Sequence, residues 1–131
     1  MVVYNESLRL PDTRRHYRSI GVERFAVIDN VSDDDTLELL LEQPDCDVYQ
    51  MPCEMRLAAG GAVWRSALIL ARYGTNRWVL CADADEHLVY DDCKRYELKH
   101  LVKALEREGR SCERKERTLS EFSVSGGCWS D

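Results

Sequence analysis

The chain has 131 residues, a common size for one domain, and 44% of them are hydrophobic, which is enough for one core. Its 18 lysines and arginines against 24 aspartates and glutamates give a formal net charge of −6. This acidic balance argues against a general nucleic-acid binder or a binder of anionic membranes, because both need a basic surface.

The beginning of the chain predicts two strands with a helix between them. Residues 2–4 form a short apolar start that is typical of a buried strand. Residues 10–20 are expected to form a helix, because Pro11 suits its first turn and Gly21 suits its end. The apolar run at 25–28 contains β-branched and aromatic residues and precedes turn formers, so it predicts a second buried strand.

A second helix is expected directly after these strands. The acidic residues 32–35 favour a helix N-terminus, because negative charge interacts well with that end of the helix dipole. Leu37, Leu40 and Leu41 follow at i, i+3 and i+4 and place one apolar face on a helix that ends near Glu42.

The middle of the chain predicts further alternation. Residues 48–51 suit a third strand, and 52–61 suit a loop that ends in two glycines. Apolar residues at helical spacing predict a helix over 63–71. The run at 77–82 is the clearest strand pattern in the chain, and 88–90 suits another short strand.

Residues 98–105 predict a last amphipathic helix, which Gly109 ends. Alternating strands and helices are typical of an α/β fold, here a Rossmann-like, mostly parallel sheet with helices on both faces. We assign this domain to residues 1–109. The stretch 110–131 is charged and rich in serine and glycine, and is expected to be a poorly ordered tail.

The apolar runs and the cysteines bear on location. The longest apolar runs, 67–71 and 78–82, are far shorter than the roughly 20 residues of a membrane span, so no transmembrane segment is expected. No charged and apolar leader opens the chain, which argues against secretion. We therefore expect a cytoplasmic protein with reduced thiols and, without a CxxC pair, no structural zinc. The cysteines are Cys46, Cys53, Cys81, Cys93, Cys112 and Cys128.

Polar side chains follow the predicted strands at the edge where open α/β sheets bind ligands. They are Asn5 and Glu6 after the first strand, Asp29 and Asn30 after the second, and Asp83, Asp85 and Glu86 after the clearest one. Their convergence predicts a binding site at this edge. The sequence carries no P-loop, no GxGxxG dinucleotide motif and no GxSxG elbow.

Asp83 and Asp85 bracket one small residue, so both carboxylates point the same way if this segment is extended. Two such carboxylates repel each other unless a cation binds between them, and Mg²⁺ or Mn²⁺ would complete its shell with phosphate. The alternative is a solvated acidic turn. His87 is either a further ligand for Mn²⁺ or an ordinary strand-edge histidine, and the acidic run 33–35 is either a cation site or, more simply, a helix cap.

A series of short stretches between residues 1 and 109 then shows a recognisable order. They are Val2-Val3-Tyr4-Asn5-Glu6, Leu10-Pro11, His16-Tyr17-Arg18-Ser19-Ile20-Gly21-Val22, Val27-Ile28-Asp29-Asn30, Thr36-Leu37, Trp64, Tyr73-Gly74-Thr75, Trp78, Asp83-Ala84-Asp85-Glu86 and Leu88-Val89-Tyr90. Together they resemble family 2 glycosyltransferases, in particular the bacterial subgroup with the motifs RNE, VDNGSTDGT and DADE.

The resemblance implies a GT-A fold that binds a nucleotide-diphosphate sugar, most simply a UDP-sugar, with Mg²⁺ or Mn²⁺. By this match Asn5-Glu6 would line the nucleotide pocket, and Asp29-Asn30 would lie at the base of the bound nucleotide, its nucleobase. Asp83 and Asp85 would be the DxD pair that binds the metal, with Asp83 also near the nucleotide. In such enzymes the metal offsets charge on the leaving diphosphate.

The chain also departs from the family pattern. It reads Asn-Val-Ser-Asp-Asp-Asp-Thr at 30–36, without the two glycines of the family motif, so a turn that needs a positive φ is questioned. Thr13 and Arg14 stand at positions that are often apolar, which weakens the buried face of the first helix. No residue matches the family's general base, so the catalytic residues and the acceptor are unknown.

Three functions stay open on this basis. The first is a donor-side glycosyltransferase domain that transfers a glycosyl group if an acceptor half is supplied. The second is a truncated remnant that binds nucleotide without transfer. The third is a Mg²⁺-dependent phosphohydrolase with Asp83 as nucleophile, which we rank last because Glu86 and His87 do not suit that motif.

Overall fold

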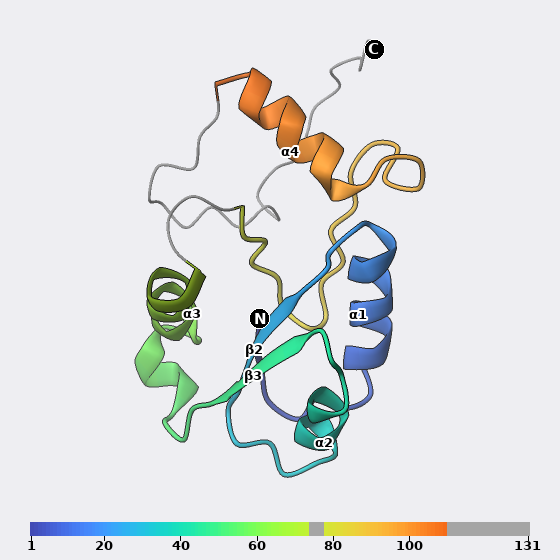
Figure 1. Ribbon diagram of the computed structural model, residues 1–131. Coiled ribbons are helices and arrows are strands. Elements are labelled where there is room, and N and C mark those ends of the chain that lie inside the picture. Colours follow the sequence, from blue (N-terminus) through green and yellow to red (C-terminus); the bar gives the residue numbers. More distant parts are fainter. Residues whose placement is uncertain (74–77, 110–131) are drawn as a thin grey trace.

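The computed structural model describes residues 1–73 and 78–109 of the chain. The predicted tail, 110–131, lies outside the described residues. The described elements in chain order are β1 (Val2–Val3), α1 (Leu10–Ser19), β2 (Phe25–Asp29), α2 (Thr36–Leu41), β3 (Cys46–Gln50), the 3-10 helix η1 (Met55–Ala58), α3 (Ala62–Leu68), the π-helix η2 (Ile69–Tyr73) and α4 (Leu98–Arg107) (Figure 1).

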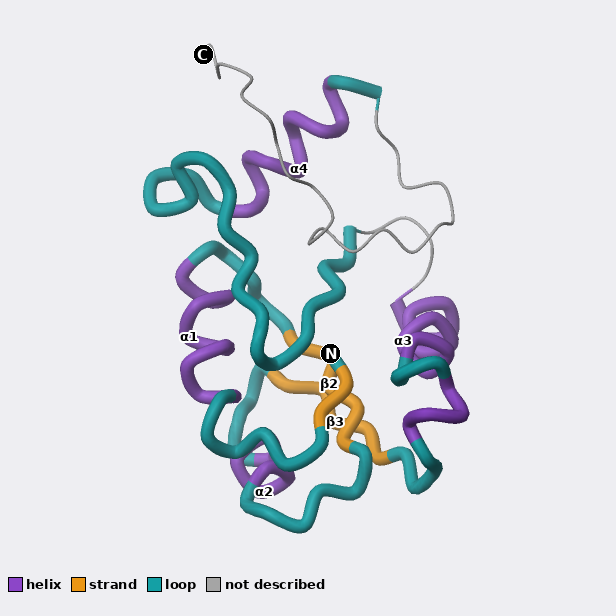
Figure 2. Tube along the Cα trace, turned by 180° about the vertical axis from the view of Figure 1, so that it is seen from behind, coloured by secondary structure: helices purple, strands orange, loops and turns teal. Residues whose placement is uncertain are grey.

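The three strands form one parallel sheet in the order β1-β2-β3, so the predicted α/β class is confirmed. Helices lie on both of its faces: α1 and α2 on one side and α3 on the other (Figures 1 and 2). Val3 and Val27 point toward α1 and α2. Val2 points the other way, where a Cβ added to Gly61, just before α3, would lie 2.8 Å from its side chain.

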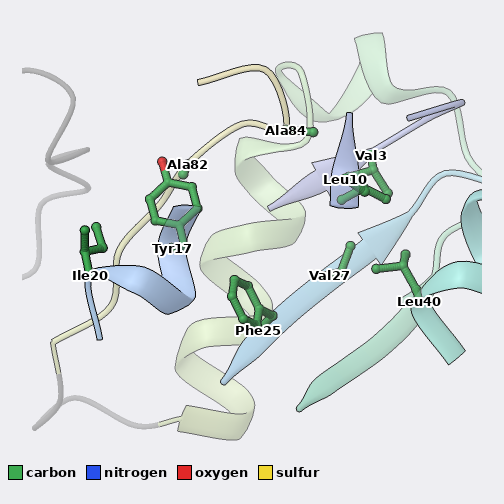
Figure 3. Close-up of a cluster of buried hydrophobic side chains, with 9 residues drawn as sticks. All are labelled: Val3, Leu10, Tyr17, Ile20, Phe25, Val27, Leu40, Ala82 and Ala84. Atoms are coloured by element: carbon green, nitrogen blue, oxygen red, sulfur yellow. The ribbon is translucent and has the colours of Figure 1, made fainter. Parts of the chain in front are cut away.

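The main core lies between the sheet and α1 (Figure 3). Val27 and Leu40 are completely buried, and burying an aliphatic side chain of this size contributes about 1.5–3 kcal/mol. The nine side chains of this cluster are Val3, Leu10, Tyr17, Ile20, Phe25, Val27, Leu40, Ala82 and Ala84. Two of them come from beyond residue 80, so the last part of the described chain closes the core that the first part begins.

Helix α1 agrees closely with its prediction, with Pro11 in the first turn and Gly21 directly after the C-cap Ile20, at a φ of +93°. Thr13 and Arg14 do face the core, as their spacing requires, and both are buried. Thr13 donates a hydrogen bond from Oγ1 to the carbonyl of Ala84. The Arg14 Nε atom, in contrast, has no hydrogen-bond partner among the described residues. The buried face is therefore partly polar, and one of its two polar members is only partly satisfied.

The strands predicted at 77–82 and 88–90 are wrong for the residues that the structure describes: 78–82 and 88–90 have no regular secondary structure. This segment bonds to α1 side chains instead of to a strand. Three side chains of α1 each bond to one backbone carbonyl of this segment: Thr13 to that of residue 84, Tyr17 to that of residue 86 and His16 to that of residue 88. Since β1 has only two residues, it offers little backbone for a further strand to pair with. The apolar run correctly predicted burial, but burial does not require pairing.

The other elements differ from their predictions mainly at the ends. The third strand begins at Cys46, two residues earlier than expected, and the predicted loop 52–61 contains η1. The helix predicted at 63–71 is α3 followed by η2. Helix α4 packs Leu101 and Leu105 against residues such as Trp78 and Leu80. In the described ranges no helix is long and apolar enough to span a membrane.

Candidate functional site

The loops after β1 and β2 are bonded to each other at the carboxyl edge of the sheet. Asn5, whose φ is +54°, donates from Nδ2 to Asp33 Oδ1 at 2.6 Å and accepts from the Asp33 N–H at 3.0 Å. The Asn5 N–H donates to Ser32 Oγ at 3.0 Å. The sequence correctly places these loops together, and it does not show that the Asn5 side chain bonds to the neighbouring loop.

A second set of bonds joins the same loop to the start of α2. The Glu6 N–H donates to Thr36 Oγ1 at 2.8 Å, and the Glu6 carboxylate pairs with Arg9 at 3.0 Å. Asp34 accepts from the N–H groups of Thr36, at 2.9 Å, and Ser7, at 3.2 Å. Hydrogen bonds from Thr36 first, and then from Ser7, lower the pKa of Asp34 to about 2. The simpler of the two interpretations of the acidic run therefore describes Asp34, which binds backbone at the helix entry.

Asp29 and Asn30 also bond to their own chain. Asp29 is completely buried and accepts from Ser32 Oγ at 2.5 Å and from Gln50 Nε2 at 3.3 Å. Asn30 donates from Nδ2 to the carbonyls of Met51, at 2.6 Å, and Cys53, at 2.7 Å. Contact between Asp29 and a nucleotide base would require Ser32 or Gln50 to release this carboxylate.

Asp83 and Asp85 lie on a tight turn, in which the Glu86 N–H donates to the Asp83 carbonyl at 3.3 Å. The segment is therefore not extended, so the alternation of an extended chain does not place the two carboxylates on one side. Both carboxylates are still exposed, since Ala82 and Ala84 take the buried positions. The turn packs beside Val3 and Leu10 near the carboxyl end of β1 (Figure 3).

The structure adds one residue that the sequence did not indicate. Arg65 of α3 reaches Asp83, with Nη1 3.1 Å from Oδ1, and its side chain is only 22% exposed. Asp85 is different, because in the described ranges no ion pair or hydrogen bond involves its carboxylate. Helical spacing alone gave no sign that Arg65 faces residue 83, since the contact depends on how α3 packs on the sheet.

His87 does not join the two aspartates. Its ring stacks on His16, with centroids 4.3 Å apart and planes 7° from parallel, and its Nε2 lies 3.6 Å from Asp12 Oδ2. Within residues 1–73 and 78–109, no group of three or more His, Cys, Asp or Glu side chains is arranged to hold a metal. Of the side chains that the structure describes, a metal at this turn would therefore have at most two ligands of these types, for which Asp83 and Asp85 are the candidates.

The chain was compared with protein families, curated proteins and solved structures, and none of them matches it.

Proposed function

We propose that this chain is the donor-side domain of a glycosyltransferase-type protein, with a Rossmann-like sheet of the GT-A kind. In this proposal it binds a nucleotide-diphosphate sugar, most simply a UDP-sugar, together with Mg²⁺ or Mn²⁺. The observation that supports it best is the exposed Asp83–Asp85 turn, which packs beside the carboxyl end of β1. Open α/β sheets bind ligands at this edge, and the sequence motifs there resemble those of family 2 glycosyltransferases.

The donor atoms at the turn suit a hard divalent cation. Carboxylate oxygens are the ligands that Mg²⁺ and Mn²⁺ prefer, and these ions bind readily through one or two carboxylates plus substrate phosphate. The Asp85 carboxylate can bind a cation without breaking any contact with a described residue. The Asp83 carboxylate is paired with Arg65, so it would bind the cation either beside the guanidinium or in its place. When bound, the cation would neutralise charge on the leaving diphosphate.

The bonded loops would shape the pocket beside this turn. Asn5 and Asp29 link the residues after β1 and β2 into one unit, so their hydrogen bonds fix the backbone at the sheet edge. A preorganised backbone lowers the entropic cost of binding a nucleotide. In this proposal Glu6 and Asn30 belong to the same pocket wall, as the resemblance implies.

Calorimetry with UDP tests the proposal. UDP should bind weakly in Mn²⁺ or Mg²⁺ and much more weakly in EDTA, because two carboxylates repel a diphosphate unless a cation lies between them. Asp85→Ala should abolish the dependence on metal without affecting the fold, since this side chain is exposed. Asp91→Ala, at another exposed aspartate, serves as the matched control. Equal affinity in EDTA and in metal would contradict the proposed metal site.

The Arg65–Asp83 pair favours a second candidate, a domain that binds nucleotide without a metal and without transfer. Here the guanidinium supplies the positive charge that faces the diphosphate. Arg65→Gln separates the two. If a metal binds, this variant should raise the affinity for Mn²⁺ by about two- to five-fold, because Asp83 no longer has to give up an ion pair. This factor corresponds to the free energy that an exposed ion pair usually contributes. If Arg65 itself binds phosphate, the same variant should weaken UDP binding in EDTA.

The proposed cytoplasmic location agrees with the state of the cysteines. The described cysteines, Cys46, Cys53, Cys81 and Cys93, are free, which suits a cytoplasmic site of action for an enzyme that uses sugar nucleotides.

Phosphohydrolase activity is the least favoured function, because Arg65 pairs with the Asp83 carboxylate that would act as nucleophile. A phosphatase assay with Asp83→Asn as the control tests it.

A further inference from the structure

Strand β3 is an outer strand of the described sheet, and the backbone groups on one of its edges bond to no residue that the structure describes. The hydrogen bonds from Phe25 N–H to the Asp45 carbonyl and from Met51 N–H to the Asp29 carbonyl fix which residues of β3 face β2. By this alternation the N–H and C=O groups of Val48 and Gln50 point away from β2. Within the described ranges no protein group bonds to them.

The usual protection of an outer strand is weak here. Natural sheets block free edges with proline, with lysine or with other charges. Residues 46–50 contain one charge, Asp47, and Arg24 neutralises it at 2.6 Å. Asp47 also accepts from the Tyr73 hydroxyl at 3.0 Å, so its carboxylate is bonded over the face of the sheet.

We propose that two copies of this chain associate through β3, with the two strands antiparallel and Val48 opposite Val48. In this register each Val48 N–H donates to the other Val48 carbonyl, and each Gln50 N–H donates to the other Cys46 carbonyl. The Cys46 N–H already donates to the Gln43 carbonyl at 3.2 Å, so each Cys46–Gln50 pair keeps one of its two possible bonds and the strand pair has four bonds in all. The result is one sheet that continues across both copies.

The side chains of β3 are complementary to themselves in this register. Asp47 of one copy lies opposite Tyr49 of the other, so no like charges face each other. Tyr49 already lies 3.4 Å from the Tyr73 hydroxyl and can offer its hydroxyl proton to an acceptor such as Asp47. The pairing of a hydroxyl donor with a carboxylate acceptor at both ends of the strand pair is the reason to choose a second copy of the chain over an unrelated extended peptide.

Exposed leucines lie on both elements that flank the strand. Leu41 at the end of α2 is 66% exposed, and Leu70 in η2 is 61% exposed. Helix α2 packs against β3, and η2 reaches it through Tyr73 and Tyr49. An interface centred on β3 would therefore have apolar surface on both sides of the new strand pair.

The test is the mass of the full chain in solution, measured by light scattering over a concentration series. We expect a dimer for the unaltered chain and a monomer for Val48→Pro, which removes an outward N–H and leaves the bonds to β2 intact. Val89→Pro, at an exposed position outside the sheet, is the matched control and should stay dimeric. A monomeric unaltered chain, or a folded Val48→Pro dimer, would overturn the proposal.

A second variant tests the register and does not depend on the proline variant folding. Gln50→Cys would lie opposite Cys46 of the other copy, where paired residues of an antiparallel sheet have Cα atoms about 5.5 Å apart, within disulfide range. Mild oxidation should link the copies covalently, and Gln50→Ser should be linked much less, since only the chain's own cysteines, such as the exposed Cys53, remain to react. A Gln50→Cys dimer that resists linking would show that another surface forms the dimer. UDP binding is measured separately, so its failure leaves this result unaffected.

Discussion

Val31 has a backbone conformation that valine rarely adopts. Its φ is +56°, in the left-handed region, and its side chain is half exposed. The position corresponds to the first glycine of the resembled motif, and the structure shows that the turn does need a positive φ there. Asp35, at the second lost glycine, has a φ of −73° and shows no such strain.

Val31→Gly should therefore stabilise the protein. A left-handed residue with a Cβ costs about 1–2 kcal/mol, and the extra freedom of glycine in the unfolded chain offsets about 0.5–1 kcal/mol of that. We expect a net gain of about 1 kcal/mol, measured as a higher midpoint in urea unfolding. Val89→Gly, at an exposed position without positive φ, should lose stability instead. Equal effects of both variants would show that Val31 is not strained.

Asp34 should make the stability of the protein depend on pH in the acidic range. Its pKa is lowered to about 2 in the folded state, from an ordinary value near 3.8, by the bonds from Thr36 and Ser7. A lowered carboxyl pKa stabilises the fold above the unfolded pKa, and this contribution disappears as the pH falls toward the folded pKa.

The comparison with Asp34→Asn measures this effect. The variant should be less stable than the unaltered chain at pH 6, and the difference should shrink steadily between about pH 4 and pH 2. Urea midpoints at several pH values give the curve, with Asp91→Asn as an exposed control. A difference that stays constant over this range would mean that the charge of Asp34 does not stabilise the loop.

At the scale of elements, α1 holds the segment 84–88 with its side chains. Tyr17 is the centre of this contact, because its hydroxyl donates to the Glu86 carbonyl at 2.9 Å and accepts from the Leu88 N–H at 3.2 Å. The turn that carries Asp83 and Asp85 thus depends on a helix far away in the sequence.

Tyr17→Phe should loosen this segment and leave the sheet unchanged. The variant keeps the buried ring and loses both hydrogen bonds, so we expect a loss of about 1–2 kcal/mol. Amide exchange should become faster at 86–88 and stay slow in β2. Tyr4→Phe is the control, since in the described ranges the half-exposed Tyr4 has no hydrogen bond from its hydroxyl. Faster exchange in β2 would indicate general destabilisation.

The elements that the sequence predicted well are those whose pattern depends only on local neighbours. Helix α1 follows from Pro11 and Gly21, and β2 follows from an apolar run of β-branched and aromatic residues. The run at 77–82 misled because buried strands and buried irregular segments have the same apolar composition. Which of the two forms depends on the groups that bond to the backbone. Here the side chains of α1, and not a neighbouring strand, bond to the carbonyls of this segment.

At the scale of the whole molecule, the 131-residue chain by itself should transfer no sugar at a useful rate. Transfer with inversion needs a base for the acceptor hydroxyl, and a positioned base contributes about 10²–10⁴-fold. Glu86 follows the Asp83–Asp85 pair directly in the sequence and is exposed, and we expect a carboxylate so close to a bound metal to orient ligands and not to serve as the base. A screen of UDP- and GDP-sugars, scored separately for transfer and hydrolysis, measures this. Robust transfer that Asp85→Ala abolishes would contradict the prediction.

The closeness of the loops that carry the candidate site residues could be predicted from the sequence, but their side-chain contacts could not. Parallel strands place their carboxyl ends together, so Asn5 and Asp29 were expected to lie near each other, and they do share bonds through the loop that holds Ser32. The pairing of Arg65 with Asp83 could not be predicted, because it joins residues that only tertiary packing brings together.

The contact between Gly61 and Val2 has a consequence for charge at the turn. The glycine just before α3 lies directly against the Val2 side chain of β1, and a Cβ added at residue 61 would lie only 2.8 Å from that side chain. Arg65 lies one helical turn further on, and its N–H donates to the Gly61 carbonyl at 3.0 Å. A methyl group at position 61 would therefore lift the start of the helix and carry the guanidinium away from Asp83. A residue with no functional group thus sets whether the turn presents one free carboxylate or two.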